Sequence, residues 1–286
     1  HLPWVLLATA IATSFYVIGF TYSQPVTMNT ISRVVRFIGQ MFPPDFDGAF
    51  LSGLVVPLFQ TIGIALMGTL LGVFVGVVLM LPATSTLMLI RPDAAGKHTL
   101  VERSVRWLVY RLARLIFTLL RSIPEVVWVL ILITVVGLGP FAATLAIGLH
   151  TGGVLGRLYA ETLEDVALAP IEALRAAGAG SVGILLWGIW PQARSMLTSY
   201  TVLRWEMNVR VSTILGLVGG GGLGQAVYNN LQLGFYPRLA TLILIIYAVV
   251  LVSDWFGDKL RARQSVGTGF CVSTFSVGPV RTAHAA

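Results

Sequence analysis

Residues 54–81 read LVVPLFQTIGIALMGTLLGVFVGVVLML and contain no charged side chain. A helix of about 20 predominantly apolar residues crosses the hydrocarbon core of a bilayer, so this stretch predicts a transmembrane helix. Similar apolar stretches occur along the rest of the chain. We expect membrane spans near residues 2–22, 54–81, 115–137, 140–160, 192–217 and 238–256. The predicted fold class is all-α, a polytopic transmembrane helical bundle of about six spans.

The composition of the whole chain agrees with a membrane protein. Its 286 residues include 19 Lys and Arg and 12 Asp and Glu, whereas a soluble chain of this length would hold roughly 70 charged residues. The single Cys cannot make an intramolecular disulfide or a multi-thiolate metal site. The net charge of +7 does not indicate nucleic acid, because the cations lie beside long apolar runs and not on a water-exposed face. We therefore expect no nucleic-acid partner, metal site or redox role.

The first stretch, 2–22, has small residues around Ala8 to Ala12 that could mark the end of a signal peptide. Its apolar run is longer than the roughly 7–15 residues of a signal core, which favours a retained helix.

The distribution of Lys and Arg between the spans predicts the orientation, because cation-rich loops stay in the cytoplasm. Residues 82–114 and the tail after 257 are rich in cations, whereas 23–53 has few and balances them with Asp. Both termini and the 161–191 connection are therefore expected in the cytoplasm.

We divide the chain into three parts. Residues 1–53 hold the first helix and an external segment, in which 31–42 is either a short amphipathic helix or an ordered loop. Residues 54–257 form the core, with the 161–191 connection inside it. Residues 258–286 are expected to be a disordered cytoplasmic tail.

The fifth span carries charges near its middle, where each costs roughly 2.5–3.5 kcal/mol on insertion scales. Glu206 and Arg210 are four residues apart and can pair along the helix. A second polar stripe runs at four-residue steps: Tyr200, Arg204, Asn208 and Ser212. We expect both sets to face the bundle interior or a wet path.

Arg204 has no partner on its own stripe, which leaves two interpretations. In the first, a carboxylate on another helix, such as Glu125, pairs with Arg204 and only holds the bundle together. In the second, Arg204 lines a path for an anionic, oxygen-rich solute, with Asn208 and Ser212 as neutral donors, because guanidinium suits phosphate-like geometry.

Other polar groups within the spans predict local structure. Pro124 should kink the third span, and Arg121 and Glu125 beside it are expected to form a local ion pair. His150, in the middle of the fourth span, is expected to make a hydrogen bond between helices and not to relay protons. No G-x-x-x-x-G-K-[ST] sequence occurs, so any ATP chemistry would belong to a partner.

The 161–191 connection contains PIEALRAAG, in which a helical run follows Pro170 and can end at Gly178. It resembles the cytoplasmic loop of membrane subunits of ATP-binding-cassette importers, which reads E-A-A-x-x-x-G and then, at a set spacing, I-x-L-P. Glu172, Ala173 and Gly178 match this pattern, and Pro191 follows at the required spacing.

Leu174, Gly188 and Trp190 depart from the Ala, Ile and Leu of that general pattern. Longer stretches look like phosphonate importer permeases in particular. These stretches are residues 121–142, 149–166, 172–192 and 200–224.

The resemblance implies a type I importer permease that moves phosphonate, phosphite or phosphate across the cytoplasmic (inner) membrane. It implies three partners: a cytoplasmic ATPase dimer that binds ATP and Mg²⁺, a periplasmic or lipid-anchored solute-binding protein, and a second permease, expected to be a copy of this chain. No cofactor, metal or catalytic residue is expected in this chain. The residues that it implies for coupling to the ATPase are Glu172, Ala173, Leu174, Arg175, Gly178 and Pro191.

Two other functions compete. An ion-coupled secondary transporter of an anionic solute would show inverted repeats and paired broken helices. It would also leave the importer-like sequence of the 161–191 connection unexplained. An intramembrane enzyme acting on a lipid phosphate would need a nucleophile with a base, or a metal cluster, and no such motif occurs in the sequence.

Overall fold

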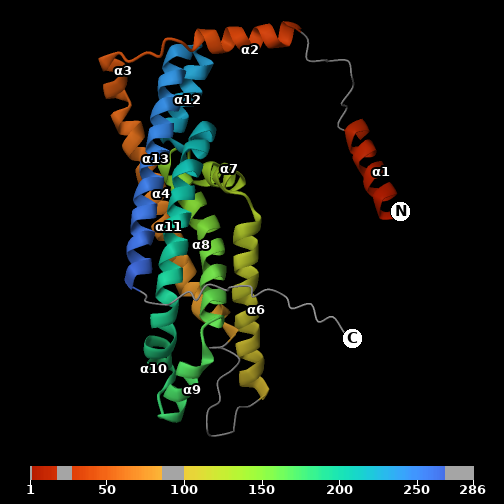
Figure 1. The fold of residues 1–286 in the computed structure, drawn as a ribbon, viewed down its shortest axis with the longest axis vertical. Helices are drawn as coiled ribbons and strands as arrows, with labels where there is room; N and C mark the ends of the chain where they lie inside the picture. Colours follow the sequence, from red (N-terminus) through yellow and green to blue (C-terminus); the bar gives the residue numbers. More distant parts are fainter. Residues whose placement is uncertain (1, 18–27, 86–99, 268–286) are drawn as a thin grey trace, which may run out of the picture.

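The computed structural model describes residues 2–17, 28–85 and 100–267, and every element in these ranges is helical. Five long helices run side by side along an elongated bundle (Figure 1). They are α4 (Val55–Ala83), α6 (Leu100–Ser122), α8 (Pro140–Glu164), α11 (Trp190–Leu215) and α13 (Tyr236–Gly267). The expected all-α class is confirmed.

Shorter elements lie at both ends of the bundle (Figure 1). At one end are α2 (Met28–Gln40), α3 (Gly48–Gly53) and α12 (Gly222–Gln232). At the other are α9 (Leu168–Ala176) and α10 (Ser181–Gly183), followed in the chain by the π-helical η1 (Ile184–Ile189). The segment 31–42, left open between helix and loop, falls largely within α2. The first helix, α1 (Leu2–Val17), stands apart from the bundle with its described side chains exposed.

Length and hydropathy identify fewer spans than the six expected. Among the described residues, Gly48–Ala83 and Tyr236–Ala262 are long and apolar enough to cross a membrane, and two bent helix pairs raise the number to four if each pair is one span. The stretch Pro3–Val17 is apolar but shorter. The expected fourth span, α8, does not pass because its glycines, His150 and Arg157 lower its hydropathy. It lies inside the bundle, where an apolar surface toward lipid is not required.

The third span is broken where Pro124 predicts a kink. α6 and α7 (Glu125–Val136) meet at 92°, and Pro124 is the residue that precedes α7. The Trp128 indole donates a hydrogen bond to the Leu120 carbonyl across the break, at 3.2 Å. α7 therefore lies across the bundle (Figure 1).

A second bend, of 53°, separates α11 and η2 (Gly216–Gly220) from α12. Gly219, Gly221 and Gly222 have φ angles of +95°, +80° and +72°, a left-handed region that glycine adopts without steric cost. The Leu223 amide then donates to the Thr61 hydroxyl on α4, at 2.8 Å. The glycine run is thus a turn between helices.

α4 and α8 share the most extensive contact between described helices. Two rows of glycines at four-residue steps face each other across this contact, which we call the glycine seam: Gly68, Gly72 and Gly76 on α4, and Gly148, Gly152 and Gly156 on α8. A methyl group added at any of these positions would press on neighbouring atoms. Small residues at this spacing let helix backbones approach closely inside a membrane.

Contacts at the α2 end fasten the loop after α2 to the start of α13. The Arg238 guanidinium donates to the Asp45 carboxylate at 3.0 Å, and the Thr241 hydroxyl donates to the Asp45 carbonyl at 2.7 Å. A hydrogen bond from the Asp47 amide and the nearby Arg238 hold the pKa of Asp45 below its usual value. At the opposite end of α13, the boundary expected at residue 257 lies inside the helix, and the tail from 268 lies outside the described residues.

Candidate functional site

The expected short helix of the 161–191 connection forms as α9. It ends where the sequence indicates, because Gly178 adopts φ +79° and its amide donates to the Arg175 carbonyl at 2.9 Å. The Ala179 amide closes the helix end on the Leu174 carbonyl, also at 2.9 Å. This left-handed glycine ending is common for helices.

One face of α9 is anchored and the other is open. Ile171 is fully buried in an apolar cluster with Leu163, Ile189 and Ala193. The polar link beside this cluster runs through Gln192, whose side chain accepts a hydrogen bond from the Ala167 amide at 3.1 Å. The residues that the resemblance assigns to coupling lie on or near the outer surface: Glu172, Ala173, Gly178 and Pro191 are exposed, and Leu174 and Arg175 are half-buried. A partner can therefore contact α9 while its base stays in the core.

Two departures from the importer pattern lie against each other. A methyl group placed on Gly188 would lie 3.0 Å from Leu174 Cδ1 and 3.6 Å from Ile171 Cγ1. Leu174 thus fills the space that a larger residue at 188 would take. The two departures are a matched exchange of a large and a small side chain, and they leave the packing of α9 on η1 intact.

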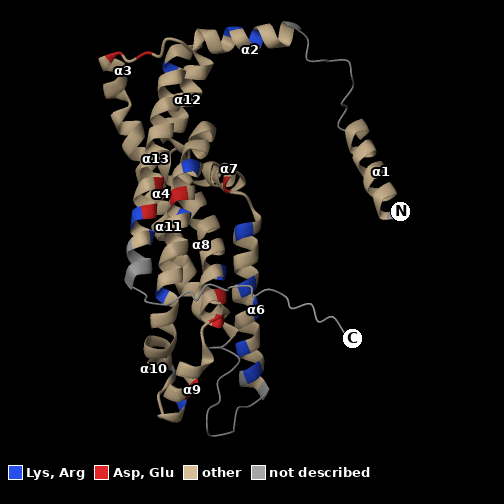
Figure 2. Ribbon diagram, viewed as in Figure 1, with Lys and Arg blue, Asp and Glu red and all other residues tan. Residues whose placement is uncertain are grey.

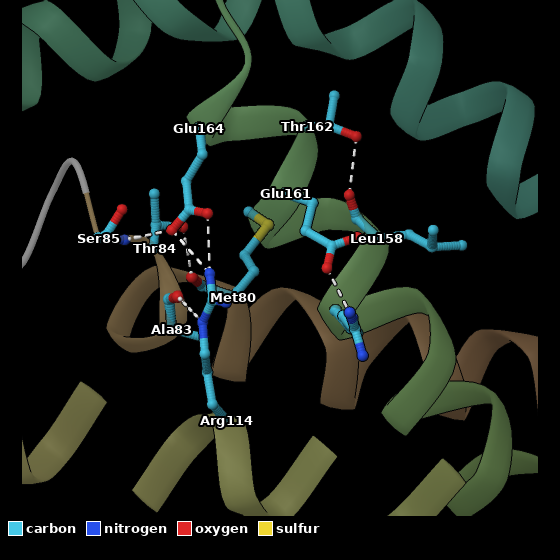
Figure 3. Close-up of polar contacts among 10 residues, drawn as sticks. Met80, Ala83, Thr84, Ser85, Arg114, Leu158, Glu161, Thr162 and Glu164 are labelled. Carbon is cyan, nitrogen blue, oxygen red and sulfur yellow. Dashed lines mark hydrogen bonds and ion pairs between the residues drawn. The ribbon is translucent and has the colours of Figure 1, made fainter. Parts of the chain in front are cut away.

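Figure 3 shows a polar cluster where α4 and α8 end beside α6. Arg114 on α6 donates from one nitrogen to both carboxylate oxygens of Glu164, at 2.9 and 2.8 Å. The Ser85 amide donates to the same carboxylate at 2.6 Å, and Arg114 Nε donates to the Ala83 carbonyl at 3.3 Å. Burial acts to raise the pKa of Glu164, but these hydrogen bonds and the guanidinium charge outweigh it and hold the pKa below its usual value. We call these four residues the clamp.

A second cluster lies in the middle of the bundle, where α7, α8 and α11 meet. Arg204 donates to Glu125 Oε1 at 3.1 Å, and His150 Nε2 lies 3.2 Å from the same oxygen. His150 Nδ1 lies 2.9 Å from the Ile123 carbonyl, so its expected hydrogen bond between helices is confirmed. Glu125 was expected to pair with Arg121, but the 92° bend at Pro124 turns α7 toward Arg204 and His150 instead.

The rest of the Arg204 stripe also faces protein. Asn208 is fully buried, and its side-chain amide donates to the Thr69 hydroxyl at 2.9 Å and the Thr151 hydroxyl at 3.1 Å. The Ser212 hydroxyl is buried on the Val209 carbonyl of its own helix, at 2.8 Å. In this conformation, Asn208 therefore joins α11 to α4 and α8.

The predicted pairing of Glu206 with Arg210 is wrong. Glu206 accepts from Arg261 at 2.6 Å, and Arg210 donates to both oxygens of Asp254, each at 2.6 Å. Both partners lie on α13, which packs against this face of α11. A partner on a neighbouring helix has displaced the pair along the same helix, and both ion pairs fasten α11 to α13.

Sequence reasoning missed the glycine seam and the clamp. The seam had a signal, since glycines recur at four-residue steps in both 54–81 and 140–160. Arg114 and Glu164 had none, because they are far apart in the chain and only the packing of α6 on α8 brings them together.

The chain is similar in sequence to permease proteins of transport systems. The phosphite transport system permease protein PtxC of Stutzerimonas stutzeri is 33% identical over 234 residues, which cover 82% of this chain and 78% of that protein. The phosphate-import permease protein PhnE of Mycolicibacterium smegmatis is 28% identical over 233 residues, covering 80% of this chain and 40% of that protein.

A similar fold occurs in a solved structure of the MetNI methionine ABC transporter in an inward-facing conformation. It matches one chain with a TM-score of 0.62 at 21% identity, covering 77% of this chain and 99% of that chain. The family described as binding-protein-dependent transport system inner membrane component matches residues 95–266. This range is more than half of the sequence and includes α9, Arg114 and Glu164 of the clamp and the Arg204 stripe, and so the chain belongs to the family of binding-protein-dependent transport system inner membrane components.

Proposed function

We propose that this chain is the permease subunit of an ATP-driven importer that carries phosphonate, phosphite or phosphate across the cytoplasmic membrane. The observation that carries the proposal is the 33% identity to a phosphite permease along 82% of the chain. The phosphate-import permease among the relatives supports the same cargo class. All three candidate cargos are tetrahedral oxyanions of phosphorus.

The proposed partners are a cytoplasmic ATPase dimer, a periplasmic or lipid-anchored oxyanion-binding protein and a second copy of this chain. ATP and Mg²⁺ would bind to the ATPase, and this chain would supply the membrane path. The exposed face of α9, with Glu172 and Ala173, is the proposed contact with the ATPase. Its buried base at Ile171 supports this role, because a force on α9 reaches the core directly.

The charge distribution supports an orientation. The Arg residues of α6 are spread along the helix, and most of them lie toward the end of the bundle that carries α9 (Figure 2). Since cation-rich segments stay in the cytoplasm, we assign the α9 end and both termini to the cytoplasmic side and α2 to the external side.

We also propose that Arg204 binds the oxyanion during its passage, with Tyr200, Asn208 and Ser212 beside it. In the described conformation Arg204 forms an ion pair with Glu125 and is not free to bind a solute. The role in transport therefore requires this pair to open when the bundle changes state. Glu206 and Arg210 were also expected on the path. Both form ion pairs with side chains of α13 instead, so we propose that they hold α11 in place.

The test is the ATPase activity of the whole complex, reconstituted in lipid with its ATPase and binding protein and titrated with methylphosphonate, phosphite and phosphate. We expect one of these oxyanions to stimulate turnover. If none does although the three-part complex forms, the cargo class is wrong.

The role of Arg204 is tested in the same assay. Arg204→Gln should lower stimulation about tenfold or more, because a hydrogen bond to a charged group is worth about 1.5–3 kcal/mol. Arg194→Gln, an exposed residue of the same helix, is the matched control. Parental stimulation in Arg204→Gln would leave Arg204 as a structural tie to Glu125.

The energy source of uptake distinguishes the proposed ATP-driven importer from the competing secondary transporter. Uptake into vesicles should stop without the ATPase and survive collapse of the ion gradients. The opposite result would favour ion coupling.

A further inference from the structure

The clamp joins three helices at one point (Figure 3). Arg114 belongs to α6, Glu164 is the last residue of α8, and Ala83 and Ser85 lie at the end of α4. Both Arg114 and Glu164 also bond to the backbone of the α4 end. Neither residue can therefore move away without breaking contacts to two other helices.

The geometry of this pair sets it apart from an ordinary surface ion pair. Exposed pairs are worth about 0–1 kcal/mol, but here each partner also makes a charge-assisted hydrogen bond to the backbone where α4 ends, which fixes its position. The Arg114 guanidinium also lies over the Tyr110 ring, 4.9 Å from its centre. By contrast, the nearby pair of Arg157 and Glu161 lies along one helix and is exposed.

The clamp lies close in sequence to α9, the proposed contact with the ATPase. α9 begins at Leu168, so only residues 165–167 separate it from Glu164. On the other side of the clamp, Ser85 is the last described residue before the connection from α4 to α6. A displacement of α9 is therefore passed along the chain to Glu164 as well as through Ile171 to the core, and Glu164 is bonded to α6 and to the end of α4.

We propose that Arg114 and Glu164 are positioning residues that transmit the movement of α9 to α4 and α6. The inference rests on the proposed function, in which the ATPase moves α9. With the clamp closed, the ends of α4 and α8 and the part of α6 around Arg114 follow α9 as one unit. With the clamp broken, α9 moves on its buried Ile171 base while α6 stays behind.

The experiment measures this movement directly in the reconstituted complex. One spin label is placed in the 161–191 connection at Val182→Cys and one on α6 at Val105→Cys, both exposed positions, in a Cys271→Ser background. Double electron–electron resonance then gives the distance between the labels with and without ATP. We expect no change on adding ATP with the intact clamp, and a change in Arg114→Gln and in Glu164→Ala, because alanine at 164 offers no acceptor to Arg114 or to the Ser85 amide.

Two further variants separate transmission from simple stability. Arg157→Gln removes the nearby exposed pair and should behave like the parent. The exchange Arg114→Glu with Glu164→Arg restores the ion pair but not the bonds to the α4 backbone, so it should recover part of the coupled movement. Each variant is tested only after co-purification shows that the complex assembles.

Transport per ATP gives a second readout. In Glu164→Ala it should fall at least about fivefold, the lower end of typical coupling between sites, while ATP is still hydrolysed. The inference is overturned if ATP changes the distance in the parent, or leaves it unchanged in Glu164→Ala. Failure of every oxyanion to be transported by the parent would instead overturn the proposed function, because the distance measurement does not depend on the cargo.

Discussion

The charges in the middle of the bundle and those at its α9 end are paired in different ways. Arg204 and Glu125 have side chains only 15% and 19% exposed, and their partners are side chains of other helices. Arg114 and Glu164 are 37% and 21% exposed and also bond to the backbone where α4 ends. The ion pair in the middle offsets the cost of burying its own charges. The ion pair at the α9 end also holds the backbone where α4 ends. Stability should therefore depend on the middle, and coupling on the end.

The largest effect is expected in the middle, at Glu125. Glu125→Ala leaves Arg204 without its carboxylate acceptor, and breaking a buried pair costs about 3–5 kcal/mol. Thermal unfolding in detergent should show this loss, and Glu125→Gln should show less because its amide oxygen still accepts. Asp258→Ala is the control, since Asp258 is 76% exposed and pairs only along its own helix. Equal unfolding of Glu125→Ala and Asp258→Ala would mean that the middle cluster is hydrated.

A smaller effect is expected in the glycine seam. In Gly72→Ala the new methyl group would lie 2.7 Å from Thr151 Cβ and 3.1 Å from the Gly152 nitrogen. Overpacking of this kind costs about 1–3 kcal/mol. Gly63→Ala on the same helix meets nothing within 4 Å and should be neutral or slightly stabilising, because alanine favours helix. Equal thermal midpoints for the two variants would argue against close packing of α4 on α8.

The smallest effect on stability is expected at the α9 end, between Leu174 and Gly188. Gly188→Ile should crowd Leu174, and Leu174→Ala should open a space, each costing roughly 1–2 kcal/mol. The double variant restores the arrangement of the general importer pattern, so its loss should be at least about 0.5 kcal/mol smaller than the sum of the single losses. Additive losses would show that the two side chains do not compensate each other. The measurement is a double-mutant cycle on the thermal midpoint.

Structural features that depend on a single segment of the chain were predictable from the sequence. Pro124 indicates the break in the third span, and Gly178 indicates the end of α9. Glu125 could be named as a partner of Arg204 because few carboxylates lie within the apolar stretches.

Pairings between segments were not predictable in the same way. Spacing alone placed Arg210 beside Glu206, but it carries no information on α13, which supplies Asp254 and Arg261. The clamp likewise depends on the stacking of α6, α8 and the end of α4. The roles of these residues in transport stay predictions, since they concern a change of state.

The glycine seam also limits how the molecule can deform. The space at each glycine of the seam is filled by neighbouring atoms, such as the side chains of Ile147 at Gly68 and Leu71 at Gly148, so little free space is left for sliding and α4 and α8 move as one stiff unit. Bending is left to the two joints that interrupt the other helices, at Pro124 and at the glycines from Gly219 to Gly222. A displacement along the bundle would then be carried by α4 and α8 together, and any rotation would fall on α7, in the middle of the bundle, and on α12, at its α2 end.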